Sequence, residues 1–117
     1  MGELDDYLAT LDEAERAVLT GIRQRAQELV PDADQGMSYG MAALRHRGRS
    51  LVGLVATRNH LSMFPFSPAV VSAVADELEG YSLSKGTIRF SVDKALPANI
   101  VDRVILLRRD EIDAALD

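Results

Sequence analysis

The stretch SLVGLVATRNHLSMFPFSP, from Ser50 to Pro68, decides the fold of this chain. Its first half is a nearly continuous apolar run, which is typical of a strand in the middle of a sheet. A polar turn follows, and the alternation in residues 60–66 predicts a second strand. Proline cannot donate a ladder hydrogen bond, so this second strand should end at Pro65 or lie at a sheet edge. Ser67 then caps a helix whose first residue is proline.

Two helices should precede this stretch. Apolar residues recur at helical spacing in residues 3–11 and again in residues 12–30. Asp12 is the expected N-cap of the second helix, and Glu15 stands three residues later, as in a capping box. The second helix should end before Pro31, because the residue before a proline avoids the helical region.

The remaining segments complete an α+β pattern. Before the central stretch we expect a loop at 32–36, a strand at 37–46 with Gly40 as a weak point, and a hairpin turn at Gly48. After it we expect a helix from Ser67 to about residue 78, a loop at 81–86, a strand at 87–92 and a helix at 96–116. The order is helices, a three-stranded meander, a helix, a strand and a helix. No repeat or linker interrupts it. We therefore expect one domain over residues 1–117, with helices packed on an antiparallel sheet.

Composition narrows the class of protein. The chain has 117 residues and no cysteine, which excludes disulfides, thiolate metal sites and cysteine nucleophiles. No apolar run reaches the roughly 20 residues of a membrane span, and the acidic N-terminus does not resemble a signal peptide. The net charge of −5 argues against nonspecific nucleic-acid binding. We therefore expect a soluble cytoplasmic protein without membrane or nucleic-acid partners.

Acidic side chains are concentrated at the start of the chain. Residues 1–34 hold nine carboxylates, whereas residues 35–75 hold none and carry four arginines. Carboxylates near a helix start interact favourably with the helix dipole, which is one explanation. The alternative is a weak oxygen-rich site for a cation such as ferrous iron. Its candidate ligands are Asp5, Asp6, Asp12, Glu13 and Glu15.

The stretch SKGTIRF, from Ser84 to Phe90, is a candidate anion site. It is not a nucleotide P-loop, because its lysine precedes the glycine and a strand follows. Gly86 nevertheless lets backbone N–H groups approach an anion, and Lys85, Thr87 and Arg89 can all donate hydrogen bonds. The alternative is a turn that leads into a strand with a solvated face. In the binding hypothesis, a wall beside the anion is formed by Tyr39 and Phe66.

Three motifs of this chain resemble the YdhG-like family of small domains, most of which have no known function. The motifs are SYGM at 38–41, FPF at 64–66 and SKGTIRF at 84–90, and the resemblance extends from about Leu4 to Ile112. The chain has Ala42 where the family usually has proline. The family includes a frataxin-like bacterial iron chaperone. The resemblance therefore implies a helix-on-sheet fold similar to frataxin, and delivery of iron to an acceptor protein.

Three classes of function follow from these observations. The first is an iron chaperone that uses the N-terminal carboxylates. The second is a binding module for a small anion at Lys85, Gly86 and Thr87. The third is an interaction domain without a ligand, which would pair through an exposed edge strand near Phe64 and Phe66. We do not expect an enzyme, because no nucleophile with a matching acid and base emerges from the sequence.

Overall fold

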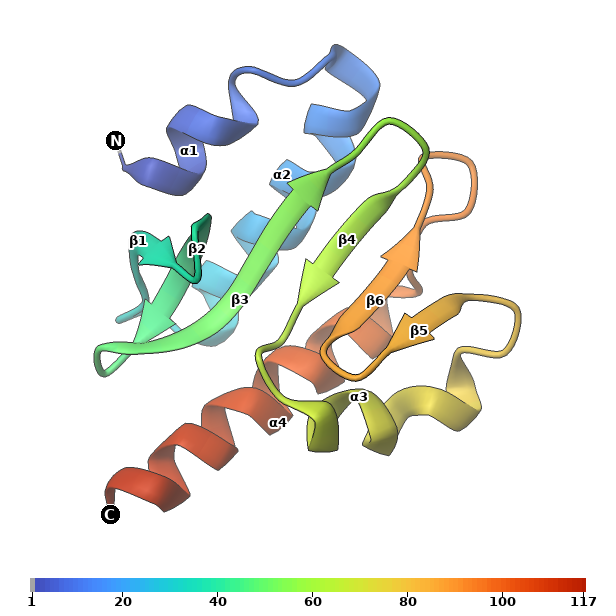
Figure 1. The fold of residues 1–117 in the computed structure, drawn as a ribbon. Helices are drawn as coiled ribbons and strands as arrows, with labels where there is room; N and C mark the ends of the chain where they lie inside the picture. The colour runs from blue at the N-terminus through green and yellow to red at the C-terminus, as the bar shows by residue number, and fades with distance from the viewer. Residues whose placement is uncertain (1) are drawn as a thin grey trace.

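The protein folds into two layers, an antiparallel sheet and a layer of helices. A computed structural model describes residues 2–117 (Figure 1). The strands are β1 (Asp34–Ser38), β2 (Met41–His46), β3 (Arg49–Ala56), β4 (Leu61–Phe64), β5 (Ser82–Ser84) and β6 (Thr87–Phe90). The helices are α1 (Glu3–Leu8), α2 (Glu13–Leu29), α3 (Pro68–Val74) and α4 (Ala98–Leu116), and a 3₁₀ turn, η1 (Ala75–Glu77), follows α3. The six strands lie in the order β1-β2-β3-β4-β6-β5, which confirms the predicted α+β class.

Local signals position the helices as predicted. The side chain of Asp12 accepts a hydrogen bond of 2.9 Å from the backbone N–H of Glu15 at the start of α2. The hydroxyl of Ser67 accepts one of 3.2 Å from the N–H of Val70 at the start of α3. Each cap satisfies a backbone donor that has no partner within its helix. Within residues 2–117, no helix combines the length and apolar character needed to cross a membrane.

Two predicted boundaries in the first hairpin are wrong. Residues 34–36 belong to β1 rather than to a loop, and Tyr39-Gly40 is a two-residue turn that divides the predicted strand 37–46. Both turn residues have positive φ, 51° and 80°, as in a type I′ hairpin turn. The sequence signal is weak because tyrosine rarely takes this conformation, and because β1 is an edge strand with one neighbour.

The predicted loop 81–86 also contains a strand, because β5 pairs with β6 and forms the other edge of the sheet. The predicted edge near Phe64 and Phe66 is wrong, since β4 lies between β3 and β6. Pro65 ends β4, as expected, but the backbone of that strand is paired on both sides. The interaction-domain hypothesis therefore loses the edge strand that motivated it.

The helices cover one face of the sheet, and Figure 1 shows α2 and α4 behind the strands. The core lies between the two layers, and its largest fully buried side chains include Leu4, Leu19, Leu44, Leu54, Leu61, Met63, Ile88 and Ile105. Side chains alternate along each strand, so Gly53, Ser62 and Arg89 lie on the opposite face, here called the open face. An antiparallel sheet commonly leaves one face without helices. On this face Met41 and Phe66 lie over Gly53, and Ser62 is buried.

Candidate functional site

Tyr39 and Phe66, the two residues of the predicted wall, stack on each other. Their ring centroids are 5.6 Å apart and the ring planes are inclined by 28°. Tyr39 lies in the β1–β2 turn and Phe66 lies just after β4, both with left-handed backbones, at φ 51° and 58°. A bulky residue in this region is strained, and such strain persists only where surrounding contacts hold it. The sequence predicted that both residues form a wall beside an anion held by Lys85, Thr87 and Arg89, but neither of them is among the residues that line the pocket of Arg89.

A glycine in the central strand lets this pair lie on the open face. A Cβ on Gly53 would come within 2.7 Å of the Met41 sulfur and 3.1 Å of Phe66 Cζ. The first distance is shorter than real Cβ contacts, so a side chain here would displace its neighbours. Because Gly53 has no side chain, Phe66 can approach β3 closely, and Tyr39 stacks on Phe66.

The four polar residues of SKGTIRF are spread along the β5–β6 hairpin. Lys85 and Gly86 form its turn, and Thr87 begins β6 opposite Ser84. Arg89 lies further along β6, opposite Ser82 and Ser62, and donates a hydrogen bond of 3.3 Å to the Ser82 hydroxyl. At about 3.3 Å per residue, roughly 13 Å of chain separates Lys85 from Arg89. Lys85 is not among the residues that line the same pocket as Arg89.

Arg89 instead lines a pocket of about 420 Å³ near the β3–β4 turn, here called the basic pocket. Its lining residues are Asn59, His60, Gly80, Tyr81, Ser82, Arg89, Phe90, Ser91 and Lys94. In the described chain, none of these nine residues carries a carboxylate. The pocket combines two permanent cations with hydroxyl, amide and imidazole groups, which suits an anion.

Contacts between two loops hold the basic pocket in shape. The Lys94 ammonium donates a hydrogen bond of 3.1 Å to the Gly80 carbonyl and lies 4.5 Å from the centroid of the Tyr81 ring. The Tyr81 hydroxyl donates one of 2.9 Å to the Ala95 carbonyl. Gly80 has φ +90°, and a Cβ there would lie 2.9 Å from the Lys94 nitrogen. The loops before β5 and after β6 are thus tied together at the pocket.

Most arginines elsewhere are already neutralised. Ion pairs with carboxylates are formed by Arg23, Arg25, Arg45, Arg47, Arg103, Arg108 and Arg109. Across residues 2–117, neither Arg89 nor Lys94 forms such a pair, and neither does Arg58, which precedes a lining residue. Positive charge is therefore left over at the basic pocket. Sequence reasoning found Arg89 but missed Lys94 and His60, because only folding brings their loops beside β6.

The five predicted metal ligands differ in what their carboxylates contact and in how exposed they are. Asp5 is bound by Arg23 and Gln35, each at 2.8 Å, and the Arg23 hydrogen bond holds the pKa of Asp5 below its ordinary value. Asp12 caps α2. The pKa of Glu15 is raised above its ordinary value, mainly by desolvation and to a smaller extent by the nearby Asp12 carboxyl. The side chains of Asp6 and Glu13 are exposed. Within residues 2–117, no three His, Cys, Asp or Glu side chains gather in a way that could hold a metal ion.

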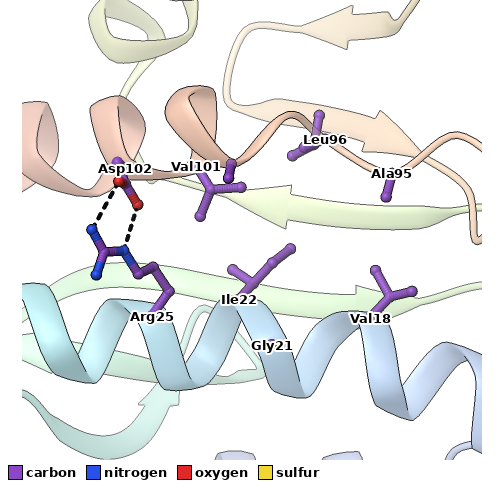
Figure 2. A pocket seen from close by; sticks show the side chains of 9 residues that line it. Val18, Gly21, Ile22, Arg25, Ala95, Leu96, Val101 and Asp102 are labelled. Carbon is purple, nitrogen blue, oxygen red and sulfur yellow. Dashed lines mark hydrogen bonds and ion pairs between the residues drawn. The ribbon is translucent and has the colours of Figure 1, made fainter.

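A second pocket lies between α2 and the start of α4 (Figure 2). It measures about 380 Å³ and is lined mainly by apolar side chains, with one ion pair at its end. Val18 and Ile22 extend from α2 toward Ala95, Leu96 and Val101 (Figure 2). We call this pocket the helix groove. Nothing in the sequence analysis pointed to it, because its two walls come from segments far apart in the chain.

The fold defines a two-layer α+β domain with six antiparallel strands and one open face. A protein of the DUF1801 family (YdhG) from Bacillus subtilis has a similar crystal structure, with a TM-score of 0.81 at 17% sequence identity. The similarity covers 97% of this chain and 91% of that chain. At this level of identity it establishes the shared fold. No protein-family model and no curated protein sequence matches the chain. None of these comparisons links the chain to frataxin.

Proposed function

We propose that this protein is a YdhG-like domain that binds a small phosphate- or carboxylate-bearing molecule in the basic pocket. One observation carries the proposal: Arg89 and Lys94 line the same pocket, have no carboxylate partner among the described residues, and meet no acidic lining residue. Support for the YdhG-like assignment comes from the shared fold and from the sequence motifs.

The two cations that line the basic pocket favour the binding of an anion. Two like charges in one concave site repel each other, and the repulsion is stronger near low-dielectric walls than in bulk water. The chain carries a net charge of −5, and Glu79 and Asp93 adjoin lining residues in the sequence, yet no carboxylate lines the pocket itself. An anion would relieve the repulsion and would accept charge-assisted hydrogen bonds from Arg89 and Lys94. The Ser82 and Ser91 hydroxyls could add neutral hydrogen bonds.

Titration with inorganic phosphate, followed by amide NMR, tests the proposal. The amides of the 80–82 and 89–94 segments should shift with saturation. Replacing Arg89→Gln or Lys94→Gln should weaken binding about tenfold or more, because a hydrogen bond to a charged group contributes about 1.5–3 kcal/mol. Lys94→Arg retains the charge and should retain most of the affinity. Urea unfolding of each variant would check that the fold is intact.

Lys85→Gln is the matched control, because Lys85 also forms no ion pair within residues 2–117 but lies in the turn at the other end of β6. It should leave phosphate binding almost unchanged. If Lys85→Gln abolishes binding and Lys94→Gln does not, the anion binds at the hairpin turn instead. If neither phosphate, sulfate nor citrate shifts any amide at millimolar concentration, anion binding is not the function.

Iron binding by the N-terminal carboxylates stays a prediction of the sequence resemblance. Since Asp5 is already held by Arg23 and Gln35, replacing all five carboxylates together would confuse iron binding with stability. A cleaner test combines Asp6→Asn, Glu13→Gln and Glu15→Gln, which leaves both Asp5 and the Asp12 cap in place. Ferrous iron, titrated under anaerobic conditions, should broaden the amides of residues 5–15 in the parent protein but not in this variant. Equal broadening in both proteins would exclude these ligands.

A further inference from the structure

Strand β1 is an edge of the sheet without the usual protection against pairing. Its only neighbour is β2, and the register of the two strands is regular (Figure 1). Exposed edges are commonly blunted by lysine, proline, a bulge or a very short strand, because free backbone groups invite another chain. β1 has the sequence DQGMS, and its single charge, Asp34, is paired with Arg45. The other edge, β5, has only three residues and is followed directly by Lys85.

The backbone groups of Gln35 and Met37 point away from β2. Ser38 and Met41 flank a two-residue turn and therefore form a hydrogen-bonded pair, and this role recurs at every second residue of β1. Gln35 and Met37 lie between those positions, so their N–H and C=O groups face outward. Within residues 2–117, no backbone hydrogen bond outside the ladder reaches either residue. These groups are available to a further strand.

The same edge is ordered and carries an exposed apolar side chain. The Gln35 amide is fixed by Asp5, because it accepts a hydrogen bond from the Asp5 N–H and donates one to the carboxylate, each of 2.8 Å. Helix α1 therefore holds β1 in place through a side chain. Met37, on the same face of the strand, is 57% exposed. An ordered edge loses little conformational freedom on association, and burial of Met37 would favour it.

From these features we propose that two copies of the protein associate through β1 and form one continuous antiparallel sheet. The two-fold axis passes between the Gly36 residues of the two copies. In this register Gln35 of each copy lies opposite Met37 of the other, and each such pair exchanges both of its N–H···O=C bonds. The Met37 thioether packs beside the Gln35 side chain of the second copy and leaves water.

The sequence of β1 fits this register. Gly36 forms the non-hydrogen-bonded pair at the axis, where the Cα atoms of neighbouring strands are only about 4.5 Å apart and no side chain can collide. Asp34 lies opposite Ser38 of the second copy, so no like charges lie directly opposite each other. The Arg45 guanidinium lies over Gly36, 2.6 Å from the position of an added Cβ, and keeps Asp34 as its own counterion.

Symmetry favours a second copy in this register over head-to-tail addition. Pairing of β1 with β1 uses the unprotected edge of both copies, so the assembly closes at two. Pairing of β1 with β5 of another copy would leave one β1 free at the end of the assembly, and it would rest on a strand of three residues. The β1 edge lies across the sheet from β5 and the basic pocket, so the two proposals fail independently.

Sedimentation equilibrium from micromolar to millimolar protein tests the proposal. The interface is a single short strand, so association should be weak, and the average mass should rise from 12.8 kDa toward twice that value. In a mixture of labelled and unlabelled protein, isotope-filtered NMR should join the Gly36 Hα protons of the two copies. A mass that stays at 12.8 kDa at millimolar concentration would overturn the proposal. Contacts between copies confined to residues outside β1 would overturn the interface.

Variants of Met37 separate association from folding. Met37→Pro removes an outward N–H, and proline is tolerated in an edge strand at such a position. It should weaken association about tenfold or more, because each copy loses a hydrogen bond to the other. Met37→Lys adds a protective charge and should have the same effect. Ser84→Lys is the matched control, since it adds that charge at an exposed position of β5. Urea unfolding checks that each variant folds. Association that survives both Met37 variants would contradict the proposal.

Discussion

The carboxylate of Asp5 joins three elements of the fold, because it accepts hydrogen bonds of 2.8 Å from Arg23 of α2 and from Gln35 of β1. The amide oxygen of Gln35 in turn accepts a hydrogen bond of 2.8 Å from the backbone N–H of Asp5. The side chain of Arg23 is largely buried, at 15% exposure. The short helix α1 is therefore fixed to the sheet edge by polar contacts as well as by its buried leucines.

Replacing Asp5→Ala should lower the free energy of unfolding by about 1–2 kcal/mol, because the hydrogen bonds of its carboxylate with Arg23 and Gln35 are lost and Arg23 is left without its charge partner. Urea unfolding at neutral pH measures this loss. Asp6→Ala is the control, since the neighbouring carboxylate is exposed and makes no side-chain hydrogen bond in the described structure. An equal loss in both variants would mean that residue 5 acts through the helix dipole rather than through Arg23.

The pH dependence of stability should follow the carboxyls with lowered pKa. Three aspartates have a lowered pKa, and in each the largest cause is a side-chain hydrogen bond. The donor is Arg23 for Asp5, Arg25 for Asp102 and His46 for Asp113. A carboxyl whose pKa is lower in the folded state stabilises the protein at pH values above the pKa of the unfolded state, which is ordinarily 3.8 for aspartate. This stabilisation is lost as the pH falls from about 4 through the folded pKa.

Asp102→Asn should reduce stability at pH 7 and make the acid-induced loss of stability shallower, because one of the titrating groups is removed. Urea unfolding across pH 2–7 measures both effects. Added salt should shrink the difference at pH 7, since the Arg25–Asp102 pair is partly exposed to solvent. A parallel shift of the whole pH profile would show that Asp102 does not stabilise the fold through its ionised form.

Adding a methyl group at Gly53 should disturb the open face. Gly53→Ala should lower the free energy of unfolding by about 1–3 kcal/mol, because its Cβ would collide with Met41 and crowd Phe66. Ring-current shifts of Tyr39 should change as Phe66 moves. Gly86→Ala, in the β5–β6 turn, is the control, since a Cβ there would have no other atom within 4 Å. Unchanged stability of Gly53→Ala would mean that Met41 and Phe66 can move aside without cost.

Tyr39→Asn should stabilise the protein by about 0.5–1 kcal/mol. Asparagine followed by glycine is preferred in a type I′ turn, whereas tyrosine at positive φ is strained. The loss of stacking on Phe66 offsets only part of this gain, because the Tyr39 side chain is 86% exposed. Thermal or urea unfolding gives the sign of the change. A clear loss of stability would show that the stacked pair holds the hairpin against the sheet.

The helices and central strands follow from signals within a few residues. The Asp12 and Ser67 caps, the proline in the first turn of α3 and the apolar run of β3 all act locally, so the sequence alone identified them. Strand β5 and residues 34–36 of β1 escaped prediction, because each edge strand pairs with one neighbour and needs little apolar alternation. The Tyr39-Gly40 turn escaped because its conformation is unfavourable for tyrosine.

The sequence by itself determined the α+β class and the order of the main elements, and it pointed to Arg89 as a candidate for anion binding. Tertiary structure decided which cations share a pocket: it separated Lys85 from Arg89 and placed Lys94 and His60 beside Arg89. It also created the helix groove from α2 and α4, which are distant in the chain. The physical reason is that caps and periodicity act within a few residues, whereas a pocket depends on strand pairing and loop contacts between remote segments.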